Sequence, residues 1–390
     1  MIPDALPTSP RPFFRPDAAR RRREAATLRE QGTGHGAIGA LLATLALGFA
    51  LLLAGCDAPS PEPQRSNATL IMWNWPNYMT AEALDGFERE TGIKVEQRIF
   101  SDEEVLLGAM QGTDFRADML IVSESMAREL IQARVVDALD PAQIPNLRHI
   151  EKASLAQSHH EGRLYGAPYL SGTTGVAVNI RHVPEGTDSW AVLWDESLRG
   201  RIAMLGNNFE VVAAASMKLG YGIVPTTEEQ FAAVEAELMR QRPLLKGYLD
   251  IDELAAGLAD GEIWAAQIYS GDALGAMEKN PDLRYFVPRE GATRWTDMIM
   301  LHRSSGHPKE VHAFIDYLNR PEVMARLSGE LYCATTNSEA KALVSKDILA
   351  DHGVYPPPEV LARCSFMPPA PPSDISARRT SELWNALTAP

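Results

Sequence analysis

The run Thr69-Leu70-Ile71-Met72-Trp73-Asn74-Trp75 is short and apolar, which is typical of a buried β-strand. The residues after it carry the signals of a helix, since Thr80 is placed to cap its beginning and Gly92 to end it. A second strand is then expected around Val95. A strand, a helix and a strand in this order begin an α/β fold.

The same alternation continues along the rest of the chain. The pattern Ser101-Asp102-Glu103-Glu104 is a capping box, and it predicts a helix through Met110. Further strands are expected at residues 118–122, 201–205 and 263–268. Further helices are expected at residues 126–133, 227–238, 308–318, 321–327 and 377–387. Strands and helices at this spacing predict mixed sheets flanked by helices on both faces.

An uncharged apolar run, AIGALLATLALGFALLLAGC, occupies residues 37–56 and follows several arginines. Its end, Leu53-Ala54-Gly55-Cys56, resembles a bacterial lipobox, in which the cysteine becomes a lipidated N-terminus. We therefore expect a signal peptide at 1–55, membrane anchoring through lipidated Cys56, and a periplasmic location. The alternative is a transmembrane helix, because the run is just long enough to span a bilayer. Residues 56–67 are Pro-rich and polar, as expected of a tether.

Composition limits the classes of function. The chain has 390 residues and a net charge of -14. Because residues 1–55 contain seven Arg and four acidic residues, the remainder carries -17. Such acidity argues against nucleic acid as a partner. The 335 residues from Cys56 onward suggest two domains of a soluble globular protein.

The three cysteines are Cys56, Cys333 and Cys364. If Cys56 is acylated, the other two form an even pair in an oxidising compartment, which favours a Cys333–Cys364 disulfide over two buried free thiols. Two cysteines without nearby paired histidines do not make a zinc site, and His159-His160 lacks a metal-ligand spacing. We therefore expect neither a metal nor a cofactor.

Short motifs follow one another in order after residue 68. They are Met72–Tyr78, Phe87-x3-Thr91-Gly92-Ile93-Lys94-Val95, Tyr165–Tyr169, Thr173–Val176, Ser189-Trp190-x2-Leu193-Trp194, Lys218–Tyr221, Pro288-x-Glu290-Gly291-Ala292, Trp295–Asp297 and Val354–Pro357. Together they resemble the polyamine (spermidine/putrescine) binding subunits of bacterial ABC transporters. The resemblance implies a type II periplasmic binding protein fold, in which two lobes hold the ligand in the cleft between them.

The resemblance also implies a domain map. Lobe 1 is expected to comprise residues 68–173 and 296–340, and lobe 2 residues 174–295 and 341–390. The chain would then cross between the lobes near residues 173–174, near 295–296 and near Ala340. The first two crossings would bring Trp295 and Asp297 to the hinge, facing the cleft.

A polyamine site needs carboxylates for the ammonium groups and aromatic walls for the methylenes, with cation–π contacts adding roughly 0.5–2 kcal/mol each. Residues that match the family's contacts are expected to bind the ligand: Trp75, Asn77, Tyr78, Ser123, Glu210, Tyr269, Asp272, Trp295, Asp297 and Tyr332. Asp297 is flanked by apolar residues, where an unpaired charge would be costly. Some of these residues have an alternative interpretation. Trp75 and Tyr78 could be core aromatics, Asp272 a solvated turn residue, and Glu210 an acidic residue in the first turn of a helix.

The sequence also departs from the family pattern. Pro76 and Asn77 stand where relatives often carry a hydroxyl and a carboxylate, and Asn207 replaces an Asp of the spermidine type. Ser171 replaces a frequent aromatic residue. Asp272 and the tail from Val354 resemble the putrescine type, which favours putrescine as the ligand.

The resemblance implies a monomeric binding protein that delivers a polyamine to the permease of an ABC importer. A polyamine-sensing lipoprotein and a binding protein for another small solute are alternatives. A lipid-anchored hydrolase is a third, but the sequence has no G-x-S-x-G elbow, H-E-x-x-H helix or P-loop. We therefore expect no enzymatic activity.

Overall fold

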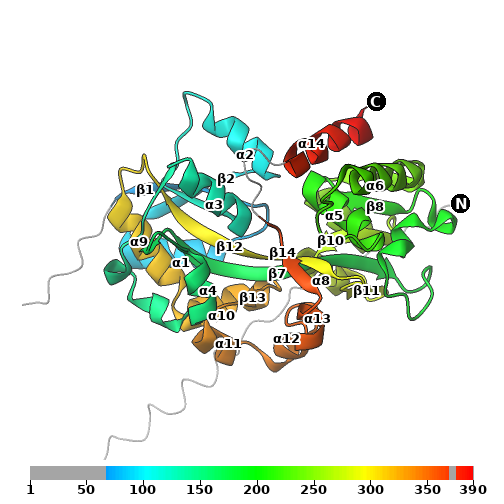
Figure 1. The fold of residues 1–390 in the computed structure, drawn as a ribbon. Helices are drawn as coiled ribbons and strands as arrows, with labels where there is room; N and C mark the ends of the chain where they lie inside the picture. The colour runs from blue at the N-terminus through cyan, green and yellow to red at the C-terminus, as the bar shows by residue number, and fades with distance from the viewer. Residues whose placement is uncertain (1–66, 369–374, 390) are drawn as a thin grey trace, which may run out of the picture. The chain divides into compact units, whose positions relative to one another are not determined.

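The computed structural model describes residues 67–368 and 375–389, which belong to the unit Pro63–Pro390. It confirms the predicted α/β class (Figure 1). The expected signal peptide, Cys56 and nearly all of the tether lie outside the described residues. No helix in the described ranges is long and apolar enough to cross a membrane.

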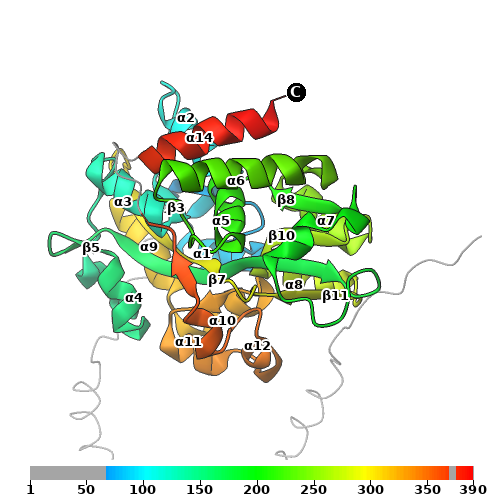
Figure 2. The ribbon, with the colours of Figure 1, turned by 45° about the vertical axis from the view of Figure 1, so that its right-hand side comes forward.

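The main sheet is mixed, and its central strands follow the order β2-β1-β3-β12-β7-β10-β8-β9 (Figures 1 and 2). Short strands β4, β11, β13 and β14 pair with β7 or β12. The strands are β1 Thr69–Asn74, β2 Lys94–Ile99, β3 Met119–Ser123, β4 Val136–Asp137, β7 Gly166–Asn179, β8 Ile202–Leu205, β9 Leu245–Leu249, β10 Ala265–Tyr269, β11 Leu283–Phe286, β12 Ala292–His302, β13 Ala334–Thr335 and β14 Cys364–Phe366. A small separate hairpin joins β5 His159–His160 to β6 Arg163–Leu164.

The long strand β7 links two groups of strands. The first group is β2-β1-β3-β12, and the second group is β10-β8-β9. Up to Thr173 it pairs with β12, where Arg294 lies opposite Thr173. From Thr174 onward it pairs with β10, where Tyr269 lies opposite Thr174. The partner of β7 therefore changes between two adjacent residues, and each part of the strand belongs to a different hydrophobic core.

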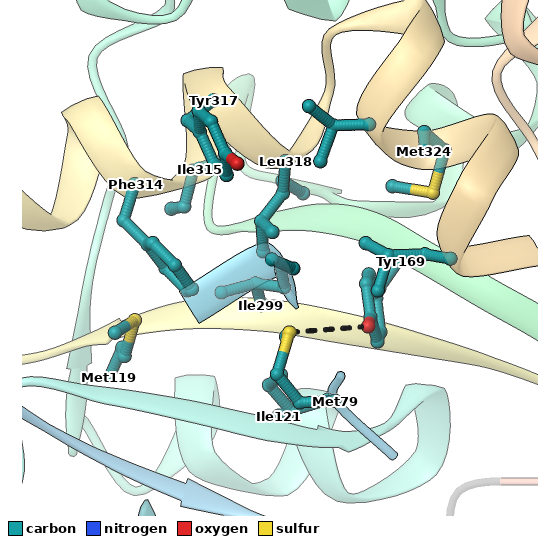
Figure 3. Close-up of a cluster of buried hydrophobic side chains, with 14 of the residues drawn as sticks. Met79, Met119, Ile121, Tyr169, Ile299, Phe314, Ile315, Tyr317, Leu318 and Met324 are labelled. Carbon is teal, nitrogen blue, oxygen red and sulfur yellow. Dashed lines mark hydrogen bonds between the residues drawn. The ribbon is translucent and has the colours of Figure 1, made fainter. Parts of the chain in front are cut away.

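The first group of strands has helices on both faces. One face packs against α1 Ala81–Thr91, α9 Pro308–Leu318 and α10 Pro321–Glu330, through a core that includes Phe87. Tyr169 and Phe314 of the same core are shown in Figure 3. The other face packs against α2 Glu103–Met110 and α3 Glu124–Gln132. Phe87 and Phe314 meet edge-on, with ring centroids 4.9 Å apart. Burial of these large side chains stabilises the layers by about 1.5–3 kcal/mol each.

The second group is built in the same way. Helices α5 Asn208–Lys218, α6 Glu228–Gln241 and α14 Ile375–Thr388 cover one face, and α7 Ile251–Ala259 and α8 Ser270–Lys279 cover the other. Trp190 and Trp194 are buried in the first of these layers, so they act as packing residues. The remaining helices are α4 Lys152–Gln157, α11 Ser338–Leu343, α12 Lys346–Ala350 and α13 Pro358–Leu361.

The local signals in the sequence act mostly as predicted. The Thr80 hydroxyl accepts the Ala83 N–H at the beginning of α1, and Gly92 ends that helix with φ 76°. The N-cap of α2 is Asp102, which accepts the Val105 N–H, and not Ser101 as the capping-box pattern indicated. The shift by one residue makes Glu103 the first residue of α2.

The predicted disulfide is wrong for this structure, in which Cys333 and Cys364 are free and buried. Cys333 packs in the core beside α1 and α9, whereas Cys364 packs in the core beside α5 and α6. Each thiol donates to a nearby backbone oxygen, Cys333 to Leu331 at 3.2 Å and Cys364 to Val360 at 3.3 Å. The even number of cysteines carried no information about which core each would join.

The segment after Ala340 packs differently from the expected domain map. Val344 is buried in the same core as Phe87, and Ile348, Leu349 and Tyr355 pack against that core. The change of core comes later, since Val360 and Cys364 pack with the second group of strands. Residues 341–355 were expected in lobe 2, but Val344, Ile348, Leu349 and Tyr355 pack with the core of the first group of strands.

Candidate functional site

A cavity of about 570 Å³ lies between the two groups of strands. All ten side chains predicted to contact a ligand line it: Trp75, Asn77, Tyr78, Ser123, Glu210, Tyr269, Asp272, Trp295, Asp297 and Tyr332. They come from segments separated by more than 250 residues of sequence. Their shared location follows from the sheet topology.

Strand ends bring most of these residues together. Trp75 follows β1, Ser123 ends β3 and Tyr269 ends β10. Strand β1 is parallel to β3, and β10 is parallel to β8, so the carboxyl ends within each pair meet at one edge. Ligands of open α/β sheets bind in the crevice at that edge. Since the apolar runs predicted these strands, the same runs place the polar residues that follow them.

Asp297 lies at an irregularity of β12. It is opposite Ser123 of β3, and the register with β7 shifts between Thr296 and Met298. A bulge of this kind turns a side chain away from the regular pleat. Asp297 is only 6% exposed, and burial raises the pKa of its carboxyl to about 7, although the neighbouring Tyr78 hydroxyl lowers it in part. Ionising a carboxyl group that is buried in this way is costly unless a cation binds beside it.

Aromatic rings form a continuous wall beside Asp297. The Trp295 ring meets both Tyr78 and Tyr269 edge-on, with centroid separations of 6.2 Å in each case. Trp295 lies opposite Gly172 in the sheet, and a Cβ at Gly172 would come within 2.5 Å of the indole. Glycine is needed there because the indole packs directly over the backbone of β7.

Glu210 lies in the first turn of α5, which agrees with its alternative interpretation as a first-turn acid. It also lines the cavity. Two hydroxyls donate to it: Thr174 of β7 at 2.9 Å and Thr293 of β12 at 2.7 Å. Burial raises the pKa of its carboxyl to about 7, and the two hydroxyls offset part of that rise. Because Thr174 and Thr293 belong to the two strands that connect the halves of the sheet, Glu210 is held by both.

Asp272 lies in the first turn of α8, and burial raises the pKa of its carboxyl to about 7. Two other cavity residues have an unusual backbone, Asn77 with φ 53° and Tyr332 with φ 51°. Asn tolerates the left-handed region, whereas a Tyr held there costs of order 1–3 kcal/mol and is often found at functional sites. The Asn77 amide donates to Asp252 of α7 at 2.6 Å, so its side chain bridges the cavity mouth.

Several cavity residues were not predicted as ligand contacts. The most notable is Glu103, whose sequence context indicated only a helix-capping role. Asn207 caps α5 by accepting the Glu210 N–H at 3.1 Å, and it also lines the cavity. Phe366 and Met367 of the tail form part of the wall. The position of Glu103 in the turn between a strand and a helix was the available signal, because such turns lie at the same edge as the site.

The raised pKa values predict how the stability of the unliganded protein depends on pH. Ordinary values are 3.8 for Asp and 4.5 for Glu, whereas the folded values of Asp297, Asp272, Glu210 and Glu103 are about 7. Between pH 4 and 7 the folded state therefore binds more protons than the unfolded state, and stability is expected to fall as pH rises through this window.

Thermal unfolding of the unliganded protein at pH 5, 6, 7 and 8 measures this effect. Because other groups also titrate, the wild type is compared with Asp297→Asn, which removes one of the four groups. The wild type is expected to lose more stability between pH 5 and pH 8 than the variant does. Identical losses would contradict a raised pKa at Asp297.

A family profile described as "Bacterial extracellular solute-binding protein" matches residues 115–351. The match covers more than half of the chain and includes most of the cavity residues. The chain belongs to this family. Its members bind solutes for transport and are not enzymes, so this solute-binding protein is assigned a binding role.

Two relatives with names are also periplasmic binding proteins. A putrescine-binding periplasmic protein of Pseudomonas aeruginosa is 28% identical over 87% of this chain and 96% of its own length. A putrescine-binding periplasmic protein of Escherichia coli is 27% identical over 76% of this chain and 85% of its own length. Both alignments extend along most of the solute-binding protein rather than one motif.

Solved structures show the same fold. A putative spermidine/putrescine ABC transporter protein of Listeria monocytogenes matches with a TM-score of 0.77 and 26% identity, over 83% of this chain and 99% of that chain. A spermidine/putrescine substrate-binding protein of Streptococcus pneumoniae matches with a TM-score of 0.70 and 25% identity, over 82% and 98%. These are type II periplasmic binding proteins, as the sequence motifs implied.

Proposed function

We propose that this protein captures a polyamine in the cavity and delivers it to the permease of an ABC importer. The observation that carries the proposal is the set of three carboxylates around one cavity, of which Asp297 is buried and Glu210 and Asp272 are half-buried. Within the described ranges none of the three makes an ion pair. Buried charges are costly unless paired, so a ligand with several ammonium groups supplies the missing partners.

The aromatic residues of the cavity wall also favour a polyamine as the ligand. The rings of Tyr78, Trp295 and Tyr269 follow one another along the cavity. Flat aromatic faces cover methylene groups, and each cation–π contact with an ammonium contributes roughly 0.5–2 kcal/mol. A polyamine combines both features, since its methylene chain separates its charges. The names of the relatives, which include putrescine and spermidine, support this choice.

The ligand is held between two lobes. Lobe 1 comprises residues 68–173 and 296–340, and the packing of residues 341–355 extends it. Lobe 2 comprises residues 174–295 and the tail from about 358. The change of strand partner between Thr173 and Thr174 supports the first crossing. Hydrogen bonds from Asn77 to Asp252 (2.6 Å) and from Asn208 to Glu104 (2.9 Å) join the lobes across the cavity mouth.

The protein acts as a periplasmic monomer anchored to a membrane through lipidated Cys56. The lipobox pattern supports the anchor, and the periplasmic relatives support the compartment. The Pro-rich residues 56–67 separate the anchor from the folded lobes, which gives the protein room to meet a permease.

A thermal-shift screen of the unlipidated protein from residue 57 onward tests the ligand class. The ligands are putrescine, cadaverine, spermidine and spermine, with glutamate and citrate as acidic controls. At about 100 times its dissociation constant, a true ligand is expected to stabilise the protein by ~2.7 kcal/mol. The proposal would be contradicted if an acidic control stabilised the protein, or if none of the four amines did.

A further inference from the structure

Two hydrogen bonds cross the cleft at the rim of the cavity, and both join protein to protein. The Asn77 amide of lobe 1 donates to a carboxylate oxygen of Asp252 in lobe 2 at 2.6 Å. In the opposite direction, the Asn208 amide of lobe 2 donates to a carboxylate oxygen of Glu104 in lobe 1 at 2.9 Å. A hydrogen bond to an ionised acceptor is roughly twice as strong as one between neutral groups.

These residues lie beside the ligand site rather than in it. Asp252, Asn208 and Glu104 do not line the cavity, although the residue before each of them does. Asn77 does line the cavity, and its amide donates to the other lobe. An effect of Asn208 or Glu104 on ligand binding therefore acts through the position of the lobes and not through contact with the ligand.

Local structure orients both amide donors. Asn208 is 7% exposed at the beginning of α5, and its side-chain oxygen accepts the Phe209 N–H at 2.7 Å. The nitrogen of the same amide is thereby directed to Glu104. Asn77 has φ 53°, in the left-handed region that Asn adopts more readily than most residues. Donors that are held in place before closure lose less conformational freedom when the lobes meet.

The lobes also approach closely at a glycine of α8. A Cβ at Gly271 of lobe 2 would come within 2.7 Å of the Leu331 oxygen and 2.9 Å of the Cys333 Sγ, both in lobe 1. Gly271 is not among the residues with positive φ, so its own backbone conformation does not require glycine. The missing side chain is needed for the contact with lobe 1.

The acidic residues of the cavity oppose closure when no ligand is bound. Burial raises the pKa of the Tyr269 hydroxyl, and carboxylates of both lobes add to the rise: Glu210 and Asp272 of lobe 2, and Glu103 and Asp297 of lobe 1. Like charges from the two lobes therefore surround one ring and repel each other when ionised. Closing the empty cleft requires attractive contacts elsewhere between the lobes.

We propose that the Asn77–Asp252 and Asn208–Glu104 hydrogen bonds form a latch that holds the lobes together without a ligand and slows the release of a bound amine. An amine enters an open cleft, but it leaves only after the latch breaks, so the latch acts on the dissociation rate. The four residues are positioning residues. The inference rests on the proposed function for the kind of ligand, whereas the contacts between the lobes are independent of it.

Small-angle X-ray scattering of the unliganded protein tests the latch without a ligand. Glu104→Ala removes the acceptor of one bond, and Asn77→Gly removes the donor of the other while still allowing the left-handed backbone. The combined variant is expected to have a larger radius of gyration than the wild type. The matched control is Asn146→Ala, which removes an amide–carboxylate bond to Asp316 (3.0 Å) within lobe 1 and is expected to leave the radius unchanged. Equal radii for the wild type and the combined variant would overturn the inference.

Stopped-flow binding of putrescine tests the effect on release. Glu104→Ala and Asn208→Ala are each expected to raise the dissociation rate constant about tenfold, the lower end of the range for a hydrogen bond to a charged group. The association rate constant is expected to change by less than about twofold. Because the two residues form one bond, the double variant is expected to match either single variant. Glu104→Gln keeps an acceptor oxygen and is expected to stay within about threefold of the wild-type rate.

A second kind of variant tests closure without removing a hydrogen bond. Gly271→Ala is expected to enlarge the unliganded protein and to speed the release of putrescine, because its Cβ would hold the lobes apart. Unliganded melting curves show whether each variant is folded. Unchanged dissociation rates, or effects of Glu104→Ala and Asn208→Ala that add in the double variant, would overturn the latch. A wild type that binds no amine would overturn the proposed function instead, and the scattering comparison would still test the latch.

Discussion

Asp297→Asn is expected to weaken polyamine binding by about 2–4 kcal/mol, or roughly 30- to 1,000-fold in dissociation constant. The substitution keeps the shape of the side chain and removes its charge. The ligand's ammonium group would then be buried beside a neutral amide after giving up its water. Since Asp297 is almost fully buried and next to Trp295 and Tyr78, solvent does not replace the lost charge.

Calorimetry of the wild type and the variant with the preferred amine measures this loss. A matched control is Asp85→Asn, which removes an exposed charge from α1. The unliganded Asp297→Asn protein is expected to fold and, at pH 8, to unfold at the same temperature as the wild type or higher, because it no longer carries an uncompensated buried charge. Equal affinities would remove Asp297 from the site and transfer its role to Glu210 and Asp272.

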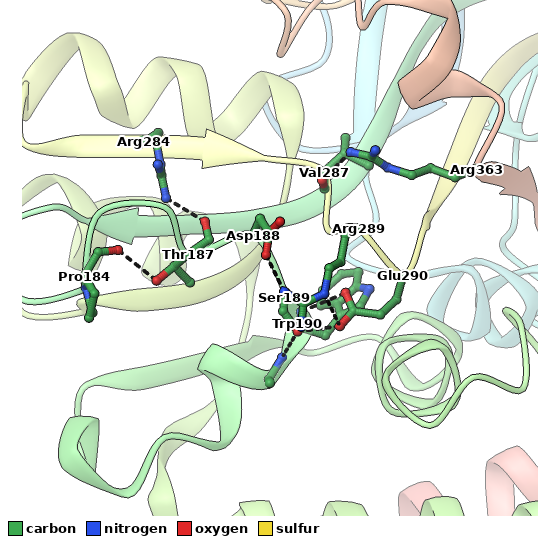
Figure 4. A network of polar contacts seen from close by, with 11 residues as sticks. Pro184, Thr187, Asp188, Ser189, Trp190, Arg284, Val287, Arg289, Glu290 and Arg363 are labelled. Carbon is green, nitrogen blue, oxygen red and sulfur yellow. Dashed lines mark hydrogen bonds and ion pairs between the residues drawn. The ribbon is translucent and has the colours of Figure 1, made fainter.

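Trp190→Ala is expected to lower the free energy of unfolding by about 3–5 kcal/mol without a direct effect on ligand contacts. Trp190 is fully buried in the core beside α5, and its indole N–H donates to the Gly291 oxygen at 2.9 Å. The adjacent Ser189 hydroxyl donates to Glu290 (Figure 4). Removing the ring would leave a large cavity and an unpaired Gly291 oxygen.

Chemical denaturation of the unliganded protein measures this loss. The matched control is Trp75→Ala, which removes the same type of ring from the cavity wall, where the side chain is half-buried. Trp75→Ala is expected to weaken amine binding more than it lowers stability, and Trp190→Ala to do the opposite. If both variants lose the same amount of stability, the distinction between a packing tryptophan and a ligand-contacting tryptophan is wrong.

The convergence of the ten predicted residues could be anticipated from the sequence for two reasons. Apolar runs indicated the strands, and the polar or aromatic residues directly after them lie at strand ends, as Trp75, Ser123 and Tyr269 do. The family motifs supplied the remaining positions. Their role in binding stays a prediction until the variants are measured.

Three features could not be anticipated. The pairing of Cys333 with Cys364 failed because the two residues pack in different cores. The boundary at Ala340 failed because the apolar residues after it, such as Val344, have no sequence mark that says which core they join. Glu103 was overlooked because its sequence context, a capping pattern, has an adequate local explanation.

By itself, the sequence determined the α/β class, the strands β1, β2, β3, β8 and β10, the caps of α1, and the residue types of a cationic-ligand site, but not the central strands β7 and β12. These follow from local periodicity, capping chemistry and motifs, which act over a few residues. Only the tertiary structure decided that β7 exchanges β12 for β10 between Thr173 and Thr174 and that Asp297 lies at an irregularity opposite Ser123. It also decided that Glu103 faces the same cavity. Strand pairing and burial depend on contacts between residues far apart in the chain, so no local pattern encodes them.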